Sequence, residues 1–193
     1  MRFLLPILLA LSVALAGGAW SAAVMLDRFE GTGTLTAGPW QADRMAGSPA
    51  ADPYSKARAA REGSLTLGLG EGIALQASTD SQGARLERTC TYRLTGATPP
   101  ARLWTLSAFD PEGRPIVPAQ GRPATLASGD LMRNDANEAV IEVGPLARSG
   151  NWLAVEGRGP FVLALTLYDT PASSSSGAGE VTMPSIERLG CGA

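Results

Sequence analysis

A stretch of eight residues near the C-terminal end, Phe161–Tyr168, constrains the fold more than any other part of the sequence. It reads FVLALTLY and has one polar side chain before the tyrosine, Thr166. A strand with one face in water alternates apolar and polar residues, whereas a strand that is apolar on both faces lies inside a covered sheet. We therefore expect a second sheet on one face of this strand and a helix or long loops on the other.

Around this strand the sequence predicts further short strands joined by turns. Leu103–Phe109 (LWTLSAF) has the same two-sided character. Ile73–Ala77 and Leu86–Leu94 alternate on either side of the turn DSQG, which predicts a hairpin. The 23 glycines and 14 prolines favour turns over long helices. The expected fold is mainly β, a β-sandwich or jelly-roll-like domain.

One short soluble helix is predicted at Pro53–Glu62. Asp52 has the side chain of a good N-cap, Pro53 fits the first helical position, and Gly63 fits the C-terminal stop. This helix is the expected cover for the second face of the central strand, with long loops as the alternative.

The first 26 residues predict a single transmembrane helix. Phe3–Leu26 contains no charged residue, and as a helix it would be roughly 36 Å long, enough to cross a bilayer. The alternative is a cleaved signal peptide with its apolar part at Phe3–Ala16 and small residues further on that fit cleavage sites. The expected division is an anchor or signal peptide at 1–26, a linker at 27–51 and a β-sandwich domain at 52–193.

The two cysteines are far apart in the sequence, with Cys90 in a predicted strand and Cys191 close to the end. We expect a disulfide that tethers the tail, and the alternative is two unrelated thiols. A disulfide and a signal-like start both indicate an oxidising compartment. The expected localisation is therefore the cell membrane, with the domain on the periplasmic or extracytoplasmic side.

Composition excludes several classes of chemistry. The chain has no histidine, which excludes Ser-His-Asp and Cys-His catalysis, histidine-bound zinc and a histidine pH switch. We predict no metal and no cofactor. The formal net charge is −2 and no basic stripe is present, so nucleic acid is not an expected partner.

Four residues are candidates for ligand binding: Asn151, Trp152, Trp104 and Trp40. An amide beside an aromatic ring suits a sugar, because the ring stacks on the sugar while the amide hydrogen-bonds its hydroxyls. The alternative is packing, in which Trp152 closes the end of the sandwich and Asn151 adopts a turn conformation.

The acidic residues do not identify a reaction. Asp110 and Glu112 are close in sequence, as a pair of glycosidase carboxylates would need to be in space, but they lie in a predicted turn. Asp130, Asp135 and Glu138 form a loose cluster whose spacing matches no calcium loop. We assign no catalytic residue.

Three segments together resemble one family, domain of unknown function 1214. CTYRLTGATPPARLWTLSAFDPEGRP (90–115) is similar to its strand–turn–strand opening, NWLAVEGRGPFVLALTLYDTP (151–171) to its N-W-L…F-x-L-x-L-x-x-Y stretch, and MPSIERLGC (183–191) to its closing P-x-I-x-R. GPW (38–40) and GSPAADPYSKARAAREG (47–63) are similar to membrane-anchored bacterial members. The resemblance implies an envelope-associated β-sandwich without an assigned activity, and without the preceding domain of unknown function 1254 that larger relatives carry.

Two functions are compatible with these observations. The first is a membrane-anchored, non-enzymatic envelope domain that braces the surface or binds a ligand or partner, such as a glycan or an envelope protein. The second is a carboxylate-dependent enzyme acting on glycans, which rests on the sandwich class and the tryptophans alone. A pocket with two convergent carboxylates and a tryptophan would favour the enzyme.

Overall fold

The computed structural model describes residues 3–28, 33–63, 66–135, 138–173 and 181–192. Three helices are present, α1 (Leu4–Arg28), α2 (Pro53–Glu62) and the 3-10 turn η1 (Pro171–Ser173). The strands are β1 (Thr34–Ala37), β2 (Trp40–Asp43), β3 (Gly72–Ala77), β4 (Cys90–Thr95), β5 (Leu103–Phe109), β6 (Thr125–Ala127), β7 (Ile141–Gly144), β8 (Asn151–Ala154), β9 (Val162–Tyr168) and β10 (Ser185–Cys191).

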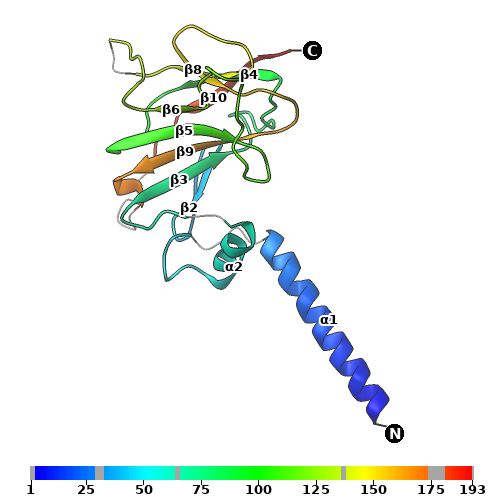
Figure 1. Cartoon of the computed structure of the whole chain (residues 1–193). Coiled ribbons are helices and arrows are strands. Elements are labelled where there is room, and N and C mark those ends of the chain that lie inside the picture. The colour runs from blue at the N-terminus through cyan, green and yellow to red at the C-terminus, as the bar shows by residue number, and fades with distance from the viewer. Residues whose placement is uncertain (1–2, 29–32, 64–65, 136–137, 174–180, 193) are drawn as a thin grey trace.

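The strands form two sheets that face each other (Figure 1). One sheet has the order β1-β2-β3-β9-β5-β6 and the other the order β10-β4-β7-β8. Neighbouring strands are antiparallel, except that β7 and β8 run parallel. The fold is a mainly β sandwich preceded by one long apolar helix, as predicted.

Strand β9 lies in the middle of the six-stranded sheet, paired with β3 on one side and β5 on the other. Leu163, Leu165 and Leu167 point into the space between the sheets and are at most 2% exposed. The second sheet therefore covers this face, as expected. On the outer face Thr166 and Tyr168 are half-buried, so this face of β9 is only partly covered.

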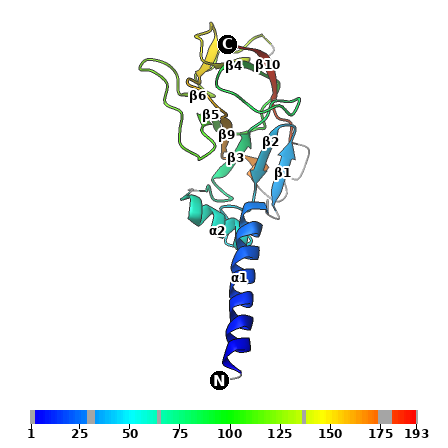
Figure 2. The ribbon, with the colours of Figure 1, turned by 90° about the vertical axis from the view of Figure 1, so that its right-hand side faces the viewer.

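Helix α2 has the predicted bounds and caps but not the predicted contacts. The Asp52 carboxylate accepts hydrogen bonds from the backbone N–H groups of Tyr54 (2.9 Å) and Ser55 (3.0 Å), and Gly63 has a φ of 64°. Instead of lying over the sheet, α2 packs at the end of α1 (Figure 2). The helices are separated in sequence by β1 and β2, and side-chain contacts from α2 to the end of α1 hold them together.

Two arginines of α2 hold the end of α1. Arg58 Nε donates to the Leu26 carbonyl oxygen at 3.1 Å, and Arg61 Nη1 lies 3.1 Å from Asp27 Oδ1. Helix α2 therefore contacts α1 at the residues where the apolar run of α1 ends.

The predicted hairpin between β3 and β4 does not form, because these strands belong to different sheets. Asp80 organises the crossing between them. Its carboxylate accepts hydrogen bonds from the N–H groups of Gln82 (3.0 Å) and Ala84 (2.9 Å), and it lies 3.3 Å from Arg188 Nη2 on β10. Alternation shows only that each strand has one buried face, and both strands bury that face in the same core.

Residues 27–51, expected as a linker, contain β1 and β2, which extend the six-stranded sheet. Gly38, with a φ of 60°, forms the turn between these strands. Trp40 is fully buried and Ala42 is 7% exposed, so β2 contributes one face to the core. The hairpin curls over one edge of the sheet (Figure 2).

Cys90 and Cys191 form a disulfide, as predicted. The two residues are direct partners at the ends of β4 and β10. The bond fixes the C-terminal edge strand to the four-stranded sheet.

Candidate functional site

Two of the predicted binding tryptophans have their indole N–H groups bonded to backbone. Trp40 Nε1 donates to the Pro184 carbonyl at 2.7 Å, and Trp152 Nε1 donates to the Gly144 carbonyl at 3.0 Å. Trp40 joins β2 to the segment that leads into β10, and Trp152 joins β8 to the end of β7. These contacts fasten parts of the sandwich to one another.

The side chain of Asn151 forms hydrogen bonds with both ends of the segment between β6 and β7. Its Oδ1 accepts from the Met132 backbone N–H at 2.7 Å, and its Nδ2 donates to the carbonyls of Met132 (2.8 Å) and Val140 (3.0 Å). Asn151 starts β8 directly beside Ile141 of β7. A single amide thus holds the start and the end of the segment between β6 and β7.

A cavity of about 390 Å³ opens between the two sheets beneath that segment. We call it the inter-sheet cavity. Its apolar walls come from four buried aliphatic side chains: Leu94, Leu106, Ile141 and Leu165. These residues belong to β4, β5, β7 and β9, so both sheets contribute.

Trp104 lies in the wall of the inter-sheet cavity and is 4% exposed. Its backbone is bonded to Ser128, whose N–H donates to the Trp104 carbonyl at 2.9 Å. In contrast to the indoles of Trp40 and Trp152, the indole N–H of Trp104 donates to no acceptor within the described part of the chain. Trp104 Nε1 is not one of the described side-chain nitrogens that are both fully buried and unbonded, so this donor keeps some exposure although the ring is buried.

Polar groups lie around the entrance of the inter-sheet cavity. Arg133 and Glu138 come from the segment that Asn151 holds, and Thr98 comes from the turn after β4. The entrance therefore carries one positive and one negative side chain, while the interior is apolar. This arrangement resembles ligand pockets in general, which combine apolar walls with a few placed polar groups.

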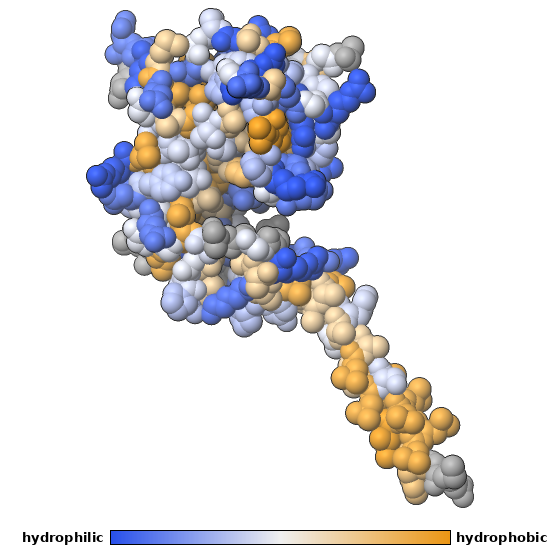
Figure 3. Space-filling model, in the orientation of Figure 1, coloured by the Kyte–Doolittle hydropathy of each residue, from blue (hydrophilic) through white to orange (hydrophobic). Residues whose placement is uncertain are grey.

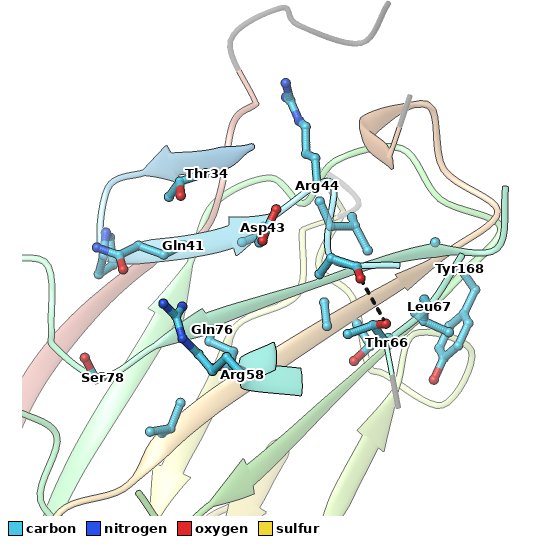
Figure 4. A pocket seen from close by; sticks show the side chains of 18 of the residues that line it. Thr34, Gln41, Asp43, Arg44, Arg58, Thr66, Leu67, Gln76, Ser78 and Tyr168 are labelled. Carbon is cyan, nitrogen blue, oxygen red and sulfur yellow. Dashed lines mark hydrogen bonds between the residues drawn. The ribbon is translucent and has the colours of Figure 1, made fainter. Parts of the chain in front are cut away.

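A second, more open hollow lies on the outer face of the six-stranded sheet (Figure 4). We call it the outer-face groove. It has a volume of about 700 Å³ and is lined by the β1–β2 hairpin, the outer faces of β3 and β9, Arg58 of α2 and residues 66–67. Thr66 Oγ1 donates to the Ala46 carbonyl at 3.3 Å, which closes one end of the groove.

The outer face of β9 forms part of the floor of this groove through Val162, Thr166 and Tyr168. The apolar character of both faces of β9 therefore has two causes. One face packs in the core, and the other lies under the groove.

Carboxylates do not converge in either hollow. Asp43 is the one carboxylate among the described residues that line the outer-face groove, and Glu138 is the one that lines the inter-sheet cavity. A glycosidase pair needs two carboxyl groups about 5–9 Å apart on either side of the substrate. The geometry therefore gives no support to carboxylate-dependent hydrolysis in these two places.

The sequence pair Asp110 and Glu112 is joined by an arginine. Arg114 Nε lies 2.7 Å from Asp110 Oδ2, and Arg114 Nη2 lies 3.3 Å from Glu112 Oε2. Desolvation raises the pKa of Asp110, but the hydrogen bonds and charge of Arg114 outweigh it and leave the pKa below the ordinary value. A lowered pKa suits a structural turn rather than a general acid.

Within the described residues, no three Asp, Glu or Cys side chains come together as a metal site would require. Glu138, one member of the predicted acidic cluster, is paired with Asn134, whose Oδ1 accepts from the Glu138 N–H at 2.8 Å.

Residues 71–172 match the family described as Protein of unknown function (DUF1214). The chain belongs to this family. In this DUF1214 chain the matched residues run from the start of β3 to η1. They include Trp104, Asn151 and the loop between them, and thus most of the inter-sheet cavity.

Among solved structures, the DUF1214 chain is similar to the VPA0106 protein of Vibrio parahaemolyticus. The TM-score is 0.64 at 17% identity, and the match covers 93% of this chain and 44% of that one. An uncharacterised protein of Burkholderia cenocepacia gives a TM-score of 0.45 at 16% identity, covering 94% of this chain and 52% of that one. The DUF1214 chain therefore spans about half the length of these structures. A comparison with curated proteins found no match.

Sequence reasoning did not single out several residues of the two hollows. Arg133 lies in a polar loop, and Gln41 and Gln76 sit at exposed positions of strands, where polar residues are ordinary. The pairing of Gln41 with Gln76 across β2 and β3 depends on register, which the sequence does not state.

Proposed function

We propose that the protein is an envelope protein, anchored in the cell membrane by α1, whose sandwich binds a small and mainly apolar ligand in the inter-sheet cavity. The observation that carries this proposal is the indole of Trp104 in the wall of the cavity, because its N–H donates to no acceptor in the described part of the chain. A ligand that supplies an acceptor oxygen gains one hydrogen bond to this N–H, a net contribution of about 0.5–1.5 kcal/mol.

The properties of α1 support the anchor. The helix has 25 residues, it is long and apolar enough to cross a membrane, and none of its residues is buried. Strongly hydrophobic side chains gather on the N-terminal part of this helix and paler ones lie nearer the sandwich, whose own surface is mixed (Figure 3). A signal peptide passes the same test of length and composition, so a cleaved leader is the alternative.

The disulfide supports a location outside the cytoplasm. Cys90 and Cys191 are joined at a sequence separation of 101 residues, and such bonds persist mainly in oxidising compartments. We therefore propose that the sandwich lies on the extracytoplasmic side of the membrane.

The size and lining of the inter-sheet cavity define the ligand class. Its volume of about 390 Å³ lies in the lower part of the range for small-molecule sites. The aliphatic walls favour a branched or cyclic hydrocarbon skeleton, and Trp104 calls for one carbonyl or ether oxygen. Arg133 and Glu138 at the entrance add polarity where the ligand meets water.

The proposal is tested with two ligands of nearly the same shape. We use 4-tert-butylcyclohexanone and the analogue in which a methylene group replaces the carbonyl oxygen, and we titrate each into the full chain labelled with ¹⁵N. The ketone should move the indole N–H resonance of Trp104 and bind roughly two- to tenfold more tightly than the alkene, because only the ketone accepts a hydrogen bond.

The matched variants are Trp104→Phe and Trp152→Phe. The preference for the ketone should disappear in Trp104→Phe and persist in Trp152→Phe, whose indole already donates to a carbonyl. If neither compound perturbs Trp104, or if the preference survives in Trp104→Phe, the proposed site is wrong.

A further inference from the structure

The walls of the outer-face groove carry amides and hydroxyls at matched positions. Gln41 of β2 and Gln76 of β3 are direct cross-strand partners, and both side chains are exposed. Ser78 continues the same wall just beyond β3, and Thr166 of β9 lies in the floor. Amides and hydroxyls that face one hollow suit a ligand with several hydroxyl groups.

The groove also carries a positive charge. Its described lining contains two guanidinium groups, Arg44 and Arg58, and one carboxylate, Asp43. Figure 4 shows the Arg58 side chain reaching from α2 toward Gln41 and Gln76. A guanidinium close to neutral polar groups is a common arrangement for binding a phosphate next to hydroxyls.

One edge of the groove is joined directly to the end of α1. Arg58, which lines the groove, donates from Nε to the Leu26 carbonyl at 3.1 Å. Leu26 is the last residue of the uncharged run, and Asp27 and Arg28 follow it. In an anchored chain the end of this run lies at the boundary between the hydrocarbon and the headgroups. The edge of the groove at Arg58 therefore lies among lipid headgroups.

We infer that the outer-face groove binds the anionic, hydroxyl-bearing headgroup of a membrane lipid, the chemistry of phosphatidylglycerol. The phosphate lies toward Arg58, and the glycerol hydroxyls bond the amides of Gln41 and Gln76. This inference rests on the proposed anchoring by α1. It is independent of the ligand proposed for the inter-sheet cavity.

The test uses the full chain, extracted from bilayers of phosphatidylcholine that contain phosphatidylglycerol as a minor lipid. Native mass spectrometry measures which lipid stays bound after detergent is removed, and it reports the mass of the intact chain in the same spectrum. Phosphatidylglycerol should be enriched by roughly fivefold or more over its share of the bilayer, about the effect of one net hydrogen bond.

The double variant Gln41→Ala/Gln76→Ala should lose most of this enrichment while its melting temperature stays unchanged. It leaves every charge in place, so attraction by arginines alone would persist in it. The control is Gln120→Ala, which removes an exposed amide from a loop that does not line the groove. Competition by soluble glycerophosphoglycerol would show that the headgroup is recognised without its acyl chains.

The outcomes separate the two proposals. A mature chain that begins near residue 17 or 24 would refute the anchor. An intact chain without enrichment, or with the same enrichment in the double variant, would refute the headgroup site and leave the anchor standing.

Discussion

The bond between Cys90 and Cys191 makes a strong prediction about stability. Replacing Cys191 with serine opens the link but removes little packing, because Cys191 is exposed whereas Cys90 is 3% exposed. At a sequence separation of 101 residues, the chain-entropy estimate for the restraint is about 4.7 kcal/mol. Measured disulfides usually contribute less, so we expect the free energy of unfolding to fall by about 2–4.7 kcal/mol.

Tryptophan fluorescence can follow this change in the full chain. Trp40, Trp104 and Trp152 all lie in the sandwich, while Trp20 lies in α1. The melting temperature of Cys191→Ser should fall by roughly 5–15 °C for a domain of this size. Urea unfolding should show a lower midpoint with a somewhat steeper slope, because the unfolded chain without the link is less compact and exposes more area.

A reducing agent provides the internal control. It should lower the urea midpoint of the wild-type protein to that of Cys191→Ser. The midpoint of the variant itself should not change. If the variant unfolds within about 1 kcal/mol of the oxidised wild type, the restraint on the tail does not stabilise the sandwich and the chain-entropy reasoning fails here.

Two further predictions concern the core. Leu163→Ala on the inner face of β9 should lower the free energy of unfolding by about 2–5 kcal/mol, whereas Thr166→Ala on the outer face should change it by less than about 1 kcal/mol; equal losses in urea melts would show that both faces are packed. Burial raises the pKa of Tyr92 above its ordinary value, so its contribution to stability is complete below about pH 10 and is lost as the pH rises further. Tyr92→Phe should therefore flatten the alkaline part of the stability profile, and an unchanged slope would contradict this.

The features that could be predicted from the sequence depend on local chemistry. The bounds of α2 follow from Asp52, Pro53 and Gly63, each of which acts on its own neighbours in the chain. The pKa of Asp52 is lowered by hydrogen bonds from Ser55, one turn into the helix. The central position of β9 follows from its composition, because a strand that is apolar on both faces is typical of the middle of a sheet, although its outer face is only partly covered here.

The features that could not be predicted depend on pairing across the sheets. The alternation of β3 and β4 is the same whether they pair or lie in opposite sheets, and only the crossing at Asp80 decides between these arrangements. Asn151 and Trp152 belong to a strand rather than a turn, because β8 runs parallel to β7. Parallel pairing brings together segments without a tight turn between them, so no local signal marks it.

The candidate site shows the same division. Trp104 is a candidate because tryptophans are common at binding sites, but only the packing of the two sheets places it in the wall of the inter-sheet cavity. Asn151 was considered beside Trp152 as a sugar contact, and in the structure its amide holds Met132 and Val140. Which groups an amide side chain bonds depends on the residues that the fold places beside it, and the sequence does not state these.

The position of β9 in the six-stranded sheet also determines when the protein can assemble. β9 is the ninth strand in the chain, yet it lies between β3 and β5 and is the link that joins them. During synthesis or export, residues 1–161 of the 193-residue chain emerge before the strand that joins β3 to β5. The protein must therefore remain open, with β3 and β5 unjoined, until residues 162–168 arrive. The pairing of β9 with β3 and β5 joins residues that are distant in sequence, so the six-stranded sheet forms more slowly than a helical domain folds. It can form only after most of the chain has been synthesised or exported.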